Sequence, residues 1–448
     1  MTQLTAEQMS GIEKIRAWHS GAFGADVFRL FGPAGTGKTT MARAIPEALG
    51  LRNVAYGAYT GKAVHVLRGK GCQPASTIHS AIYMPTQDAE ARAALSAARA
   101  ESAELEAQDK IMSEFAAEDP ALAGAFLVQS GWADLLEFRG ALDEVREKVE
   151  SLEAQCRQVA WEWNESSAWA SLDLIILDEV SMVDAKLAAD IERYNVPILV
   201  LGDPAQLPPV EGGGYYTDAT PDHLLTEIHR QALESQPLRL ATAIRTSTGA
   251  SLGLSSADYS PASLAAAMQH DQVLCWTNKR RWIVINAIRT KLGRTPGVPE
   301  AGDRIMCLTN NKDLAVFNGA QFHVLDVVAN SGLGPTLRVR GEDDGHERDI
   351  PCFSDGFRSR EAQDAAKRSG AGRSGQRMLA TFANAITVHK AQGSEWPSVY
   401  VVDETPAMIS MTAKREGAEQ AWSDARRWLY TACSRASESV TIVAGGGR

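Results

Sequence analysis

The chain has 448 residues, which is too long for one hydrophobic core and favours about three domains. A formal net charge of −10 excludes a protein that coats nucleic acid through bulk positive charge, although it allows a local basic groove. The six cysteines form no Cys-x-x-Cys pair, which excludes common zinc and disulfide frameworks. Because no signal peptide or transmembrane run is found, we expect a cytoplasmic protein that makes no membrane contact.

The N-terminal residues predict a helix that begins after Thr5. Thr5 is a suitable N-cap, and Gln8 stands three residues further on, as in a capping box. Gln8 also precedes a phosphate-binding motif, where its amide could bind an adenine edge. Spacing alone favours the cap.

A strand, a turn and a helix in residues 27–49 carry the clearest signal in the chain. Val27–Phe31 is an apolar run typical of a buried strand, and GPAGTGKT follows it at 32–39. This is a G-x-x-x-x-G-K-[ST] P-loop in the strand-to-helix setting that the motif needs. Its backbone N–H groups would bind phosphate oxygens, Lys38 the β- and γ-phosphates, and the Thr39 hydroxyl Mg²⁺. The expected ATP-binding residues are Gly35, Thr36, Gly37, Lys38, Thr39 and Thr40.

Two further segments end in residues that suit phosphate contacts. The predicted strand Asn53–Tyr59 runs into Thr60-Gly61-Lys62-Ala63, and Thr77-Ile78-His79 follows later. A small hydroxyl residue, a glycine and a lysine at the end of a strand can contact a phosphate. This signal is weak by itself, because many strand-to-helix turns carry such residues.

Residues 88–159 differ in composition from the segments around them. They are rich in Ala and Glu, with apolar residues at helical spacing. The pattern predicts a helical hairpin or a short antiparallel coiled coil, interrupted near Asp119-Pro120. A solvated insertion without chemistry and a functional arm fit it equally well.

Two apolar runs further along end in catalytic-type residues. Leu172–Leu177 reads as a buried strand that leads into Asp178 and Glu179, as in a Walker B site. There Asp178 would hold Mg²⁺, and Glu179 would orient and deprotonate the attacking water. A second run at 197–201 precedes GDPAQLPPV, in which Gln206 suits a sensor of the γ-phosphate.

Taken in order, these blocks resemble the motifs of superfamily 1 helicases, and most closely the 5′-to-3′ branch with its Dda- and RecD-like members. GPAGTGKT, YTGKA, TIH, DEVSMVD and GDPAQLPPV are similar to motifs I, Ia, Ib, II and III. LTEIHRQ at 225–231 resembles motif IV, and VLCWTNKRRWIVIN at 273–286 resembles the strand that follows it. AITVHKAQGSE at 385–395 and WLYTACSRA at 428–436 resemble motifs V and VI. The match covers most of the chain.

The resemblance implies an α/β fold with two RecA-like parallel-sheet motor domains and ATP between them. We expect the first motor at 1–84 and 166–225, with a helical insertion at 85–165. The second motor is expected at 226–301 and 377–448, with an SH3-like β-barrel insertion at 302–376. Relatives usually carry a β-hairpin wedge in the first insertion. Because this chain reads as helical there, no wedge residue is assigned.

Within 302–376 the pattern predicts short strands separated by turns. Arg304–Leu308, Gln321–Val328 and Thr336–Val339 alternate as strands do, and Asn318-Gly319 is a hairpin signal. The polar, basic stretch Arg358–Gln376 is expected to be a loop.

The resemblance also implies functional residues and partners. Motifs IV and VI would each supply an arginine to the γ-phosphate, at Arg230 and Arg435, and Glu395 would contact the nucleotide. ATP and Mg²⁺ are the expected cofactors, and single-stranded DNA and forked duplex DNA the expected partners. We expect a monomeric motor in a bacterial or phage-infected cell, with the helical insertion a candidate contact for a replication or recombination protein. The expected DNA contacts are Thr60, Lys62, Thr77, His79, Pro208, Asn278, Thr387, His389 and Lys390.

Two alternatives stay open. One is a translocase, or a RecD-like subunit of a nuclease or repair assembly, that does not itself unwind duplex. The other is a P-loop switch or scaffold that binds proteins through the hairpin. The switch would hydrolyse ATP at a rate indifferent to single-stranded DNA, and it gives motifs V and VI no role.

Overall fold

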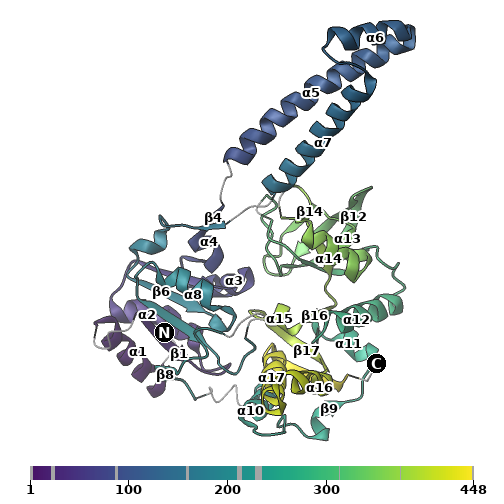
Figure 1. Cartoon of the computed structure of the whole chain (residues 1–448). Helices are drawn as coiled ribbons and strands as arrows, with labels where there is room; N and C mark the ends of the chain where they lie inside the picture. The colour runs from purple at the N-terminus through teal and green to yellow at the C-terminus, as the bar shows by residue number, and fades with distance from the viewer. Residues whose placement is uncertain are drawn as a thin grey trace. The chain divides into compact units, whose positions relative to one another are not determined.

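A computed structural model describes residues 4–21, 26–85, 89–157, 161–208, 214–227, 235–311, 313–373 and 375–445 (Figure 1). The chain divides into two compact units. One comprises Met1–Ile82 with Glu165–Arg448, and the other comprises Tyr83–Asn164. Each unit is described by itself below.

The first motor is a six-stranded sheet in the order β3-β2-β6-β7-β1-β8, and every pairing is parallel. Its strands are β1 Val27–Phe31, β2 Val54–Ala58, β3 Ala75–Thr77, β6 Leu174–Asp178, β7 Ile198–Gly202 and β8 His223–Leu224. Its helices are α1 Ala6–His19, α2 Lys38–Leu49, α3 Gly61–Gly69, α4 Ile78–Ile82 and α8 Ala185–Glu192, with short 3₁₀ turns η1 Ala168–Ser171 and η2 Val180–Met182. Strands β2, β6 and β7 are buried along their whole length, as the apolar runs predict.

The register of this sheet aligns the ends of its strands. Phe31 pairs with Gly202, and Ala58 pairs with Asp178. Since the strands are parallel, the segments that follow β1, β2, β6 and β7 all leave from the same edge. The P-loop, the Thr60 turn, the Asp178-Glu179 pair and the Gln206 segment therefore share one edge of the first motor.

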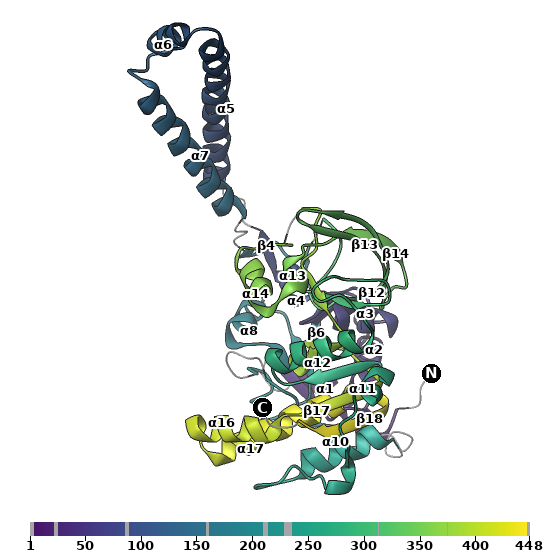
Figure 2. The ribbon, with the colours of Figure 1, turned by 90° about the vertical axis from the view of Figure 1, so that its right-hand side faces the viewer.

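The second motor is a five-stranded parallel sheet in the order β16-β10-β17-β18-β9. Figure 2 shows its strands β17 and β18. Its strands are β9 Tyr259–Ser260, β10 Gln272–Cys275, β16 Ala385–Thr387, β17 Trp396–Asp403 and β18 Ala436–Ala444. Its helices are α10 Gln236–Thr246, α11 Leu264–Gln269, α12 Asn278–Lys291, α15 Val388–Ala391, α16 Thr405–Glu416 and α17 Ala418–Cys433, with the 3₁₀ turn η3 Ser256–Asp258. Two parallel motor sheets confirm the predicted α/β class.

An antiparallel sheet in the order β14-β13-β12-β11-β15 interrupts the second motor. Its strands are β11 Arg304–Cys307, β12 Gln321–Ser331, β13 Gly334–Gly341, β14 Glu347–Pro351 and β15 Ala380–Phe382. Just beyond the ends of the two outer strands, the N–H of Met378 donates to the carbonyl of Pro351 (2.8 Å), and the N–H of Phe353 donates to the carbonyl of Met378 (3.0 Å). The sheet therefore curls until its edges meet, as in a small barrel, and we call residues 304–382 the barrel. Its apolar interior is continuous with one face of the second motor.

The prediction of a loop at Arg358–Gln376 is wrong for much of that stretch. Helix α13 spans Asp355–Arg358 and helix α14 spans Arg360–Arg368. The Ser359 hydroxyl caps α14 by accepting from the N–H of Ala362, and one side of the helix buries Gln363 and Ala366. The sequence pattern did not indicate this helix, because its charged residues outnumber its buried residues, Gln363 and Ala366.

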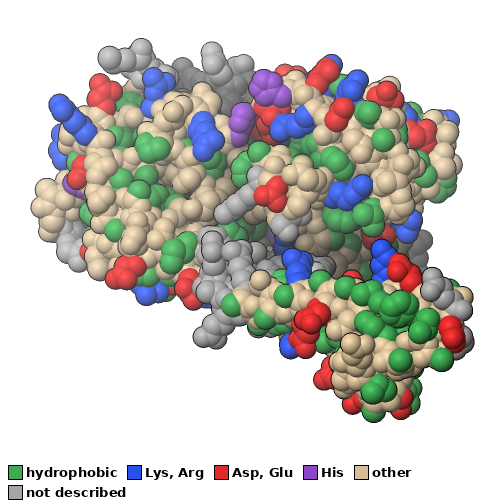
Figure 3. Space-filling view, turned by 90° about the horizontal axis from the view of Figure 1, so that it is seen from above, with side chains coloured by type: hydrophobic (Ala, Val, Ile, Leu, Met, Phe, Trp, Pro, Cys, Tyr) green, Lys and Arg blue, Asp and Glu red, His purple; other side chains and the backbone are tan. Residues whose placement is uncertain are grey.

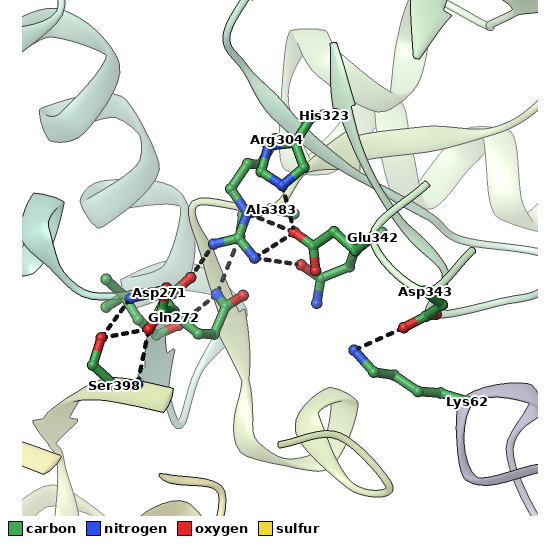
Figure 4. Close-up of polar contacts among 11 residues, drawn as sticks. Lys62, Asp271, Gln272, Arg304, His323, Glu342, Asp343, Ala383 and Ser398 are labelled. Atoms are coloured by element: carbon green, nitrogen blue, oxygen red, sulfur yellow. Dashed lines mark hydrogen bonds and ion pairs between the residues drawn. The ribbon is translucent and has the colours of Figure 1, made fainter. Parts of the chain in front are cut away.

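Arg304 ties the barrel to the second motor (Figure 4). Its guanidinium donates to Glu342 (2.9 Å from Nε to Oε1) and to the carbonyl of Asp271, just before β10. The Asp271 carboxylate in turn accepts from the Ser398 hydroxyl at 2.6 Å on β17. Burial works against ionisation of Glu342, but hydrogen bonding from His323 and the charge of Arg304 lower its pKa to about 2.

The second unit is a helical hairpin. Helices α5 Ala89–Glu118, α6 Pro120–Gln129 and α7 Leu135–Arg157 rise from a two-stranded antiparallel ribbon, β4 Tyr83–Pro85 with β5 Trp161–Trp163. It has its own small core, in which the rings of Trp132 and Phe138 meet edge to face at 5.4 Å. The break between the helices falls at Asp119-Pro120, where the Asp119 carboxylate caps α6.

Charge separates the two units. Residues 83–164 hold seven of the 45 Lys and Arg but 17 of the 55 Asp and Glu, so this unit carries the whole formal charge of −10. The larger unit is formally neutral, and on the face drawn in Figure 3 the blue and red side chains are interspersed. Among the described residues, no helix is both long and apolar enough to cross a membrane.

Candidate nucleotide site and strand-contact residues

The P-loop has the backbone that its glycines predict. Gly35 and Gly37 adopt φ of 82° and 80°, in the left-handed region that other residues avoid. A Cβ on Gly32 would lie 2.8 Å from the Thr36 hydroxyl and 2.9 Å from the Leu225 carbonyl, so the loop has no room for a side chain there. These glycines let the chain turn sharply from β1 into α2.

Polar contacts hold the loop from inside. The Lys38 ammonium donates to the carbonyls of Gly32 (2.5 Å) and Pro33 (3.0 Å), and the buried Thr36 hydroxyl donates to Pro33 at 2.9 Å. Gln8 forms the predicted capping box with Thr5, and its amide nitrogen also donates to the Thr36 carbonyl at 3.0 Å. The predicted cap is thus confirmed, and Gln8 also forms a hydrogen bond to the P-loop backbone. Contact with an adenine edge stays a prediction.

The Walker B carboxylate faces the end of the P-loop. The Thr39 hydroxyl, in the first turn of α2, donates to Asp178 Oδ2 at the end of β6 at 3.0 Å. Burial and the neighbouring Glu179 raise the pKa of Asp178, partly offset by Lys38. Glu179 is half-buried and has φ of 55°, a left-handed conformation that costs about 1–2 kcal/mol for a non-glycine residue. Such strain is concentrated at functional sites.

Gln206 lies buried in the segment after β7. Its side-chain oxygen has no hydrogen-bond partner among the described residues. Thr40 and Glu395 are exposed, with no polar contact recorded for their side chains in the described part of the chain.

Of the two arginines predicted to contact the γ-phosphate, the structure describes only Arg435. Arg435 is buried, and its guanidinium bonds within its own motor to the Thr431 carbonyl (3.3 Å), the Ser394 carbonyl (3.4 Å) and the Ser434 hydroxyl (3.2 Å). Arg230 lies in residues 228–234, outside the described residues.

The turn after β2 touches the second motor and the barrel. The Thr60 hydroxyl caps α3, and a Cβ built on Gly393, after α15, would lie 2.8 Å from it. Lys62 Nζ lies 3.5 Å from the Asp343 carboxylate of the barrel (Figure 4) and 5.0 Å from the centre of the Trp396 ring. Thr60 and Lys62, expected to contact DNA from the first motor, therefore meet the second motor at Gly393 of motif V and at Trp396 directly after it.

The remaining predicted strand contacts are spread over both motors. The Thr77 hydroxyl bonds to that of Ser80 at 2.8 Å, and the His79 ring packs against Tyr59 with centroids 5.3 Å apart. Cys275 pairs with Thr387, so Thr387 ends β16 beside the end of β10, and Asn278 begins the helix that follows β10. Burial lowers the pKa of His389. Pro208 is half-buried and directly precedes 209–213, which lie outside the described residues.

Lys390 reaches out to the barrel. Its ammonium donates to the Asn318 side chain at 2.9 Å. Lys390 is exposed, but the protein around it still removes part of the water from its ammonium group. This desolvation, together with the nearby positive charge of Lys367, lowers the pKa of Lys390 to about 8.

Sequence reasoning missed Phe317. Its ring is 53% exposed, and a Cβ built on Gly61 would lie 3.2 Å from it. An exposed aromatic side chain thus stands against Gly61, which precedes Lys62, and next in sequence to Asn318, the partner of Lys390. The Asn318-Gly319 turn marked this place, since it puts the preceding residue at the tip of a connection between strands.

Fold and site together define the class of protein. A P-loop and a Walker B pair on one parallel sheet, with a second parallel sheet beside them in the same compact unit, are the parts of a two-motor P-loop nucleoside triphosphatase. Known domains agree: residues 16–212 match an AAA domain, and residues 382–443 match a UvrD-like helicase C-terminal domain. The chain therefore carries the domains of an ATP-dependent helicase, and its motifs resemble those of superfamily 1.

Solved structures show the same fold along nearly the whole chain. One is a Pif1 helicase from a study of two coordinating Pif1 molecules at forked double-stranded DNA, with 18% identity and a TM-score of 0.50 over 99% of this chain and 92% of that one. Another is Pif1 from Bacteroides in complex with ADP-AlF3 and single-stranded DNA, with 17% identity and a TM-score of 0.51 over 100% and 93%. No curated protein matches the chain in sequence.

Proposed function

We propose that this helicase moves 5′ to 3′ along single-stranded DNA and unwinds duplex, using Mg²⁺ and ATP. One observation carries the proposal: nucleotide-site residues and candidate strand contacts both lie where the two motors meet. Near the nucleotide site, Thr431 and Gln392 of the second motor bond to Leu207, one residue after Gln206. At the candidate track, Lys62 and Thr60 meet Trp396 and Gly393. ATP-driven motion between the motors would then change their grip on the strand.

The residues present fit a bound Mg²⁺. A Walker site supplies one hydroxyl and one carboxylate, and the phosphates and water supply the other ligands. Thr39 and Asp178 are such a pair, already 3.0 Å apart. A divalent cation would also offset the burial and the Glu179 charge that raise the pKa of Asp178. When bound, the ion would neutralise charge on the β- and γ-phosphates.

In this proposal, residues of both motors take part in ATP hydrolysis. Lys38 would exchange its two carbonyl partners for phosphate oxygens, and Glu179 would orient and deprotonate the attacking water. Gln206 would use its unpartnered oxygen to read the state of the γ-phosphate. Arg435 and Arg230 would place positive charge where the transferring phosphoryl group becomes more negative. In this scheme Arg435 must leave at least one of its present backbone contacts to reach the nucleotide.

The strand would cross the turn after β2 and the motif V turn. Lys62 and Lys390 would neutralise phosphates there, while Phe317 offers an exposed ring on which a base can stack. Thr60, Thr77, Thr387 and Asn278 would supply hydroxyl and amide contacts to the backbone. Both motors reside in one chain, so a monomer has the parts needed for stepping.

The charge of the hairpin distinguishes two functional roles, a strand-separating wedge and a docking arm for another protein. A wedge must approach two DNA strands, and a surface with 17 acidic and seven basic residues repels phosphates. The three most exposed apolar side chains near its tip are Leu122, Val128 and Leu136, at 48%, 70% and 82%. These features support a docking arm for a protein of the replication or recombination machinery.

Two assays test the proposal. ATP hydrolysis should be slow for the protein alone and rise sharply with single-stranded DNA. A duplex with a 5′ single-stranded tail should be unwound, and one with only a 3′ tail should not. Hydrolysis that ignores DNA would instead support a switch, and DNA-stimulated hydrolysis without unwinding would support a translocase. Preference for a 3′ tail would contradict the proposed polarity.

A further inference from the structure

The Tyr430 side chain joins the second motor to two parts of the nucleotide site. Tyr430 lies near the end of α17 and is 2% exposed. Its hydroxyl oxygen accepts from the N–H of Ala34 in the P-loop at 3.2 Å. The same hydroxyl donates to the carboxylate of Asp203, which directly follows β7. One hydroxyl group therefore bridges the P-loop and the segment that carries Gln206.

Two neighbouring residues of the second motor, Thr431 and Gln392, contact only the segment that carries Gln206. The N–H of Leu207 donates to the Thr431 hydroxyl at 2.9 Å, and the Gln392 amide donates to the Leu207 carbonyl at 2.9 Å. Both hold the Gln206 segment against the second motor, whereas neither touches the P-loop. Tyr430 is thus the residue of this group that contacts the loop itself.

The contact has a consequence for ATP binding. Phosphates bind a P-loop through its backbone N–H groups and its lysine. Here the N–H of Ala34 is engaged by Tyr430, while Lys38 is engaged by the carbonyls of Gly32 and Pro33. A triphosphate that rearranges this loop must also change the bond to Tyr430. Because Tyr430 belongs to the second motor, that change acts on the position of α17.

The bridge is chemically well defined. Burial raises the pKa of Asp203, with Lys38 opposing the shift, and burial with the Asp203 charge raises the pKa of Tyr430 well above 10. The phenol therefore remains protonated and keeps its role as the donor. Arg435 lies one turn further along the chain and bonds to the Thr431 carbonyl, so movement of this turn of α17 would also move Arg435.

We propose that Tyr430 is a positioning residue that couples the state of the P-loop to the second motor, and so couples ATP binding to strand binding. The proposal rests on the DNA-dependent function proposed above. Coupling between two sites is reciprocal, because each ligand changes the affinity of the other by the same factor. It can therefore be measured from either side, independently of catalytic rate.

The test compares Tyr430→Phe with the wild-type full chain. Single-stranded DNA affinity is measured with and without Mg²⁺ and a non-hydrolysable ATP analogue, and the ratio of the two dissociation constants gives the coupling. Allosteric factors are typically about 5–150-fold, and Tyr430→Phe should bring the wild-type factor close to one. The DNA stimulation of kcat should fall in parallel, with a smaller change in the KM for ATP.

Tyr400→Phe is the matched control. Tyr400 is equally buried, and its hydroxyl accepts from the N–H of Ser263 at 3.0 Å within the second motor. The Tyr400→Phe variant should be less stable than the wild type but should keep the coupling between ATP binding and DNA binding. A folded Tyr430→Phe protein with the wild-type coupling factor would overturn the inference. If Tyr430→Phe does not fold, Asp203→Ala serves instead, since it removes the acceptor of the same hydroxyl, and unchanged coupling in that variant would likewise overturn it.

The two proposals fail in different ways. If the wild-type protein itself shows no coupling between the ATP analogue and DNA, the proposed function is wrong. If the wild type shows coupling and Tyr430→Phe retains it in full, only the role of Tyr430 is wrong.

Discussion

The ammonium group of Lys62 lies 3.5 Å from the carboxylate of Asp343, so a residue expected to bind DNA is paired with an acid of the barrel. Lys62 comes from the first motor, directly after β2, while Asp343 stands in the turn between β13 and β14. A DNA phosphate at Lys62 would compete with this carboxylate. If Lys62 binds a phosphate, the strength of this pair would set part of the affinity for the strand.

Replacement of Lys62 and replacement of Asp343 should change the affinity for single-stranded DNA in opposite directions. Lys62→Ala should weaken binding of single-stranded DNA and reduce the log–log salt slope by about 0.7, the value for one phosphate contact. Asp343→Asn should strengthen binding at low salt, because its neutral amide no longer competes for the ammonium. Fluorescence anisotropy over a salt series measures both.

Asp349→Asn is the control for this pair. Asp349 is exposed on the same barrel and bonds to Arg338 at 2.9 Å, so its replacement makes the same change in net charge. If Asp349→Asn and Asp343→Asn strengthen binding equally, the effect comes from overall charge and not from Lys62.

DNA binding should depend on pH through Lys390. Its lowered pKa of about 8 means that the ammonium is charged below pH 8 and loses its proton as the pH rises further. If Lys390 contacts a phosphate, affinity should fall between about pH 7 and 9. Lys390→Arg should remove this fall, because a guanidinium stays charged throughout. A wild-type affinity that is constant over this range would argue against the contact.

Glu179→Gln should separate ATP binding from hydrolysis. Removal of a positioned base typically costs about 10²–10⁴-fold in rate, and the isosteric amide leaves the Thr39–Asp178 pair in place. Nucleotide affinity measured with a fluorescent ATP analogue should therefore change little. Lys38→Ala is the comparison, since it removes phosphate-binding charge and should abolish hydrolysis. Normal turnover in Glu179→Gln would refute the assignment of the Walker B acid.

Arg435→Ala should slow hydrolysis far more than it weakens nucleotide binding. Arginines that act on a transferring phosphoryl group contribute about 10³–10⁵-fold in rate. Arg435 is also bonded to two carbonyls inside the second motor, so thermal unfolding must be compared alongside turnover. Arg230→Ala should show the same kinetic pattern. Equal losses in affinity and turnover would point to ground-state binding instead.

Removal of the hairpin tests its role in unwinding. Replacing residues 89–157 by a short flexible linker keeps the β4–β5 ribbon and removes α5, α6 and α7. DNA-stimulated hydrolysis should remain, because every nucleotide motif lies elsewhere. The acidic surface leads us to expect that unwinding also survives, as it should for a docking arm. Loss of unwinding with intact DNA-stimulated hydrolysis would identify the hairpin as the wedge.

The nucleotide site was predictable because its geometry is local. Gly35 and Gly37 create the P-loop turn within a few residues, and the buried strand before Asp178 fixes that carboxylate at a sheet edge. The capping box of Gln8 is likewise contained in four residues. In such segments the backbone conformation follows from nearby residue types, and the chemistry follows from the backbone.

Residues whose partners are distant in the chain were decided by the tertiary structure. Nothing near Tyr430 in the sequence indicates a hydroxyl shared between Ala34 and Asp203, and the same holds for the pairing of Lys62 with Asp343. Helix α14 was missed because only the burial of Gln363 and Ala366 compensates for its many charges. The sequence alone predicted the backbone of the P-loop and the strand that ends in Asp178, since both depend on local residue types. Which side chains connect the two motors depended on the packing of one sheet beside another, and no local pattern encodes that.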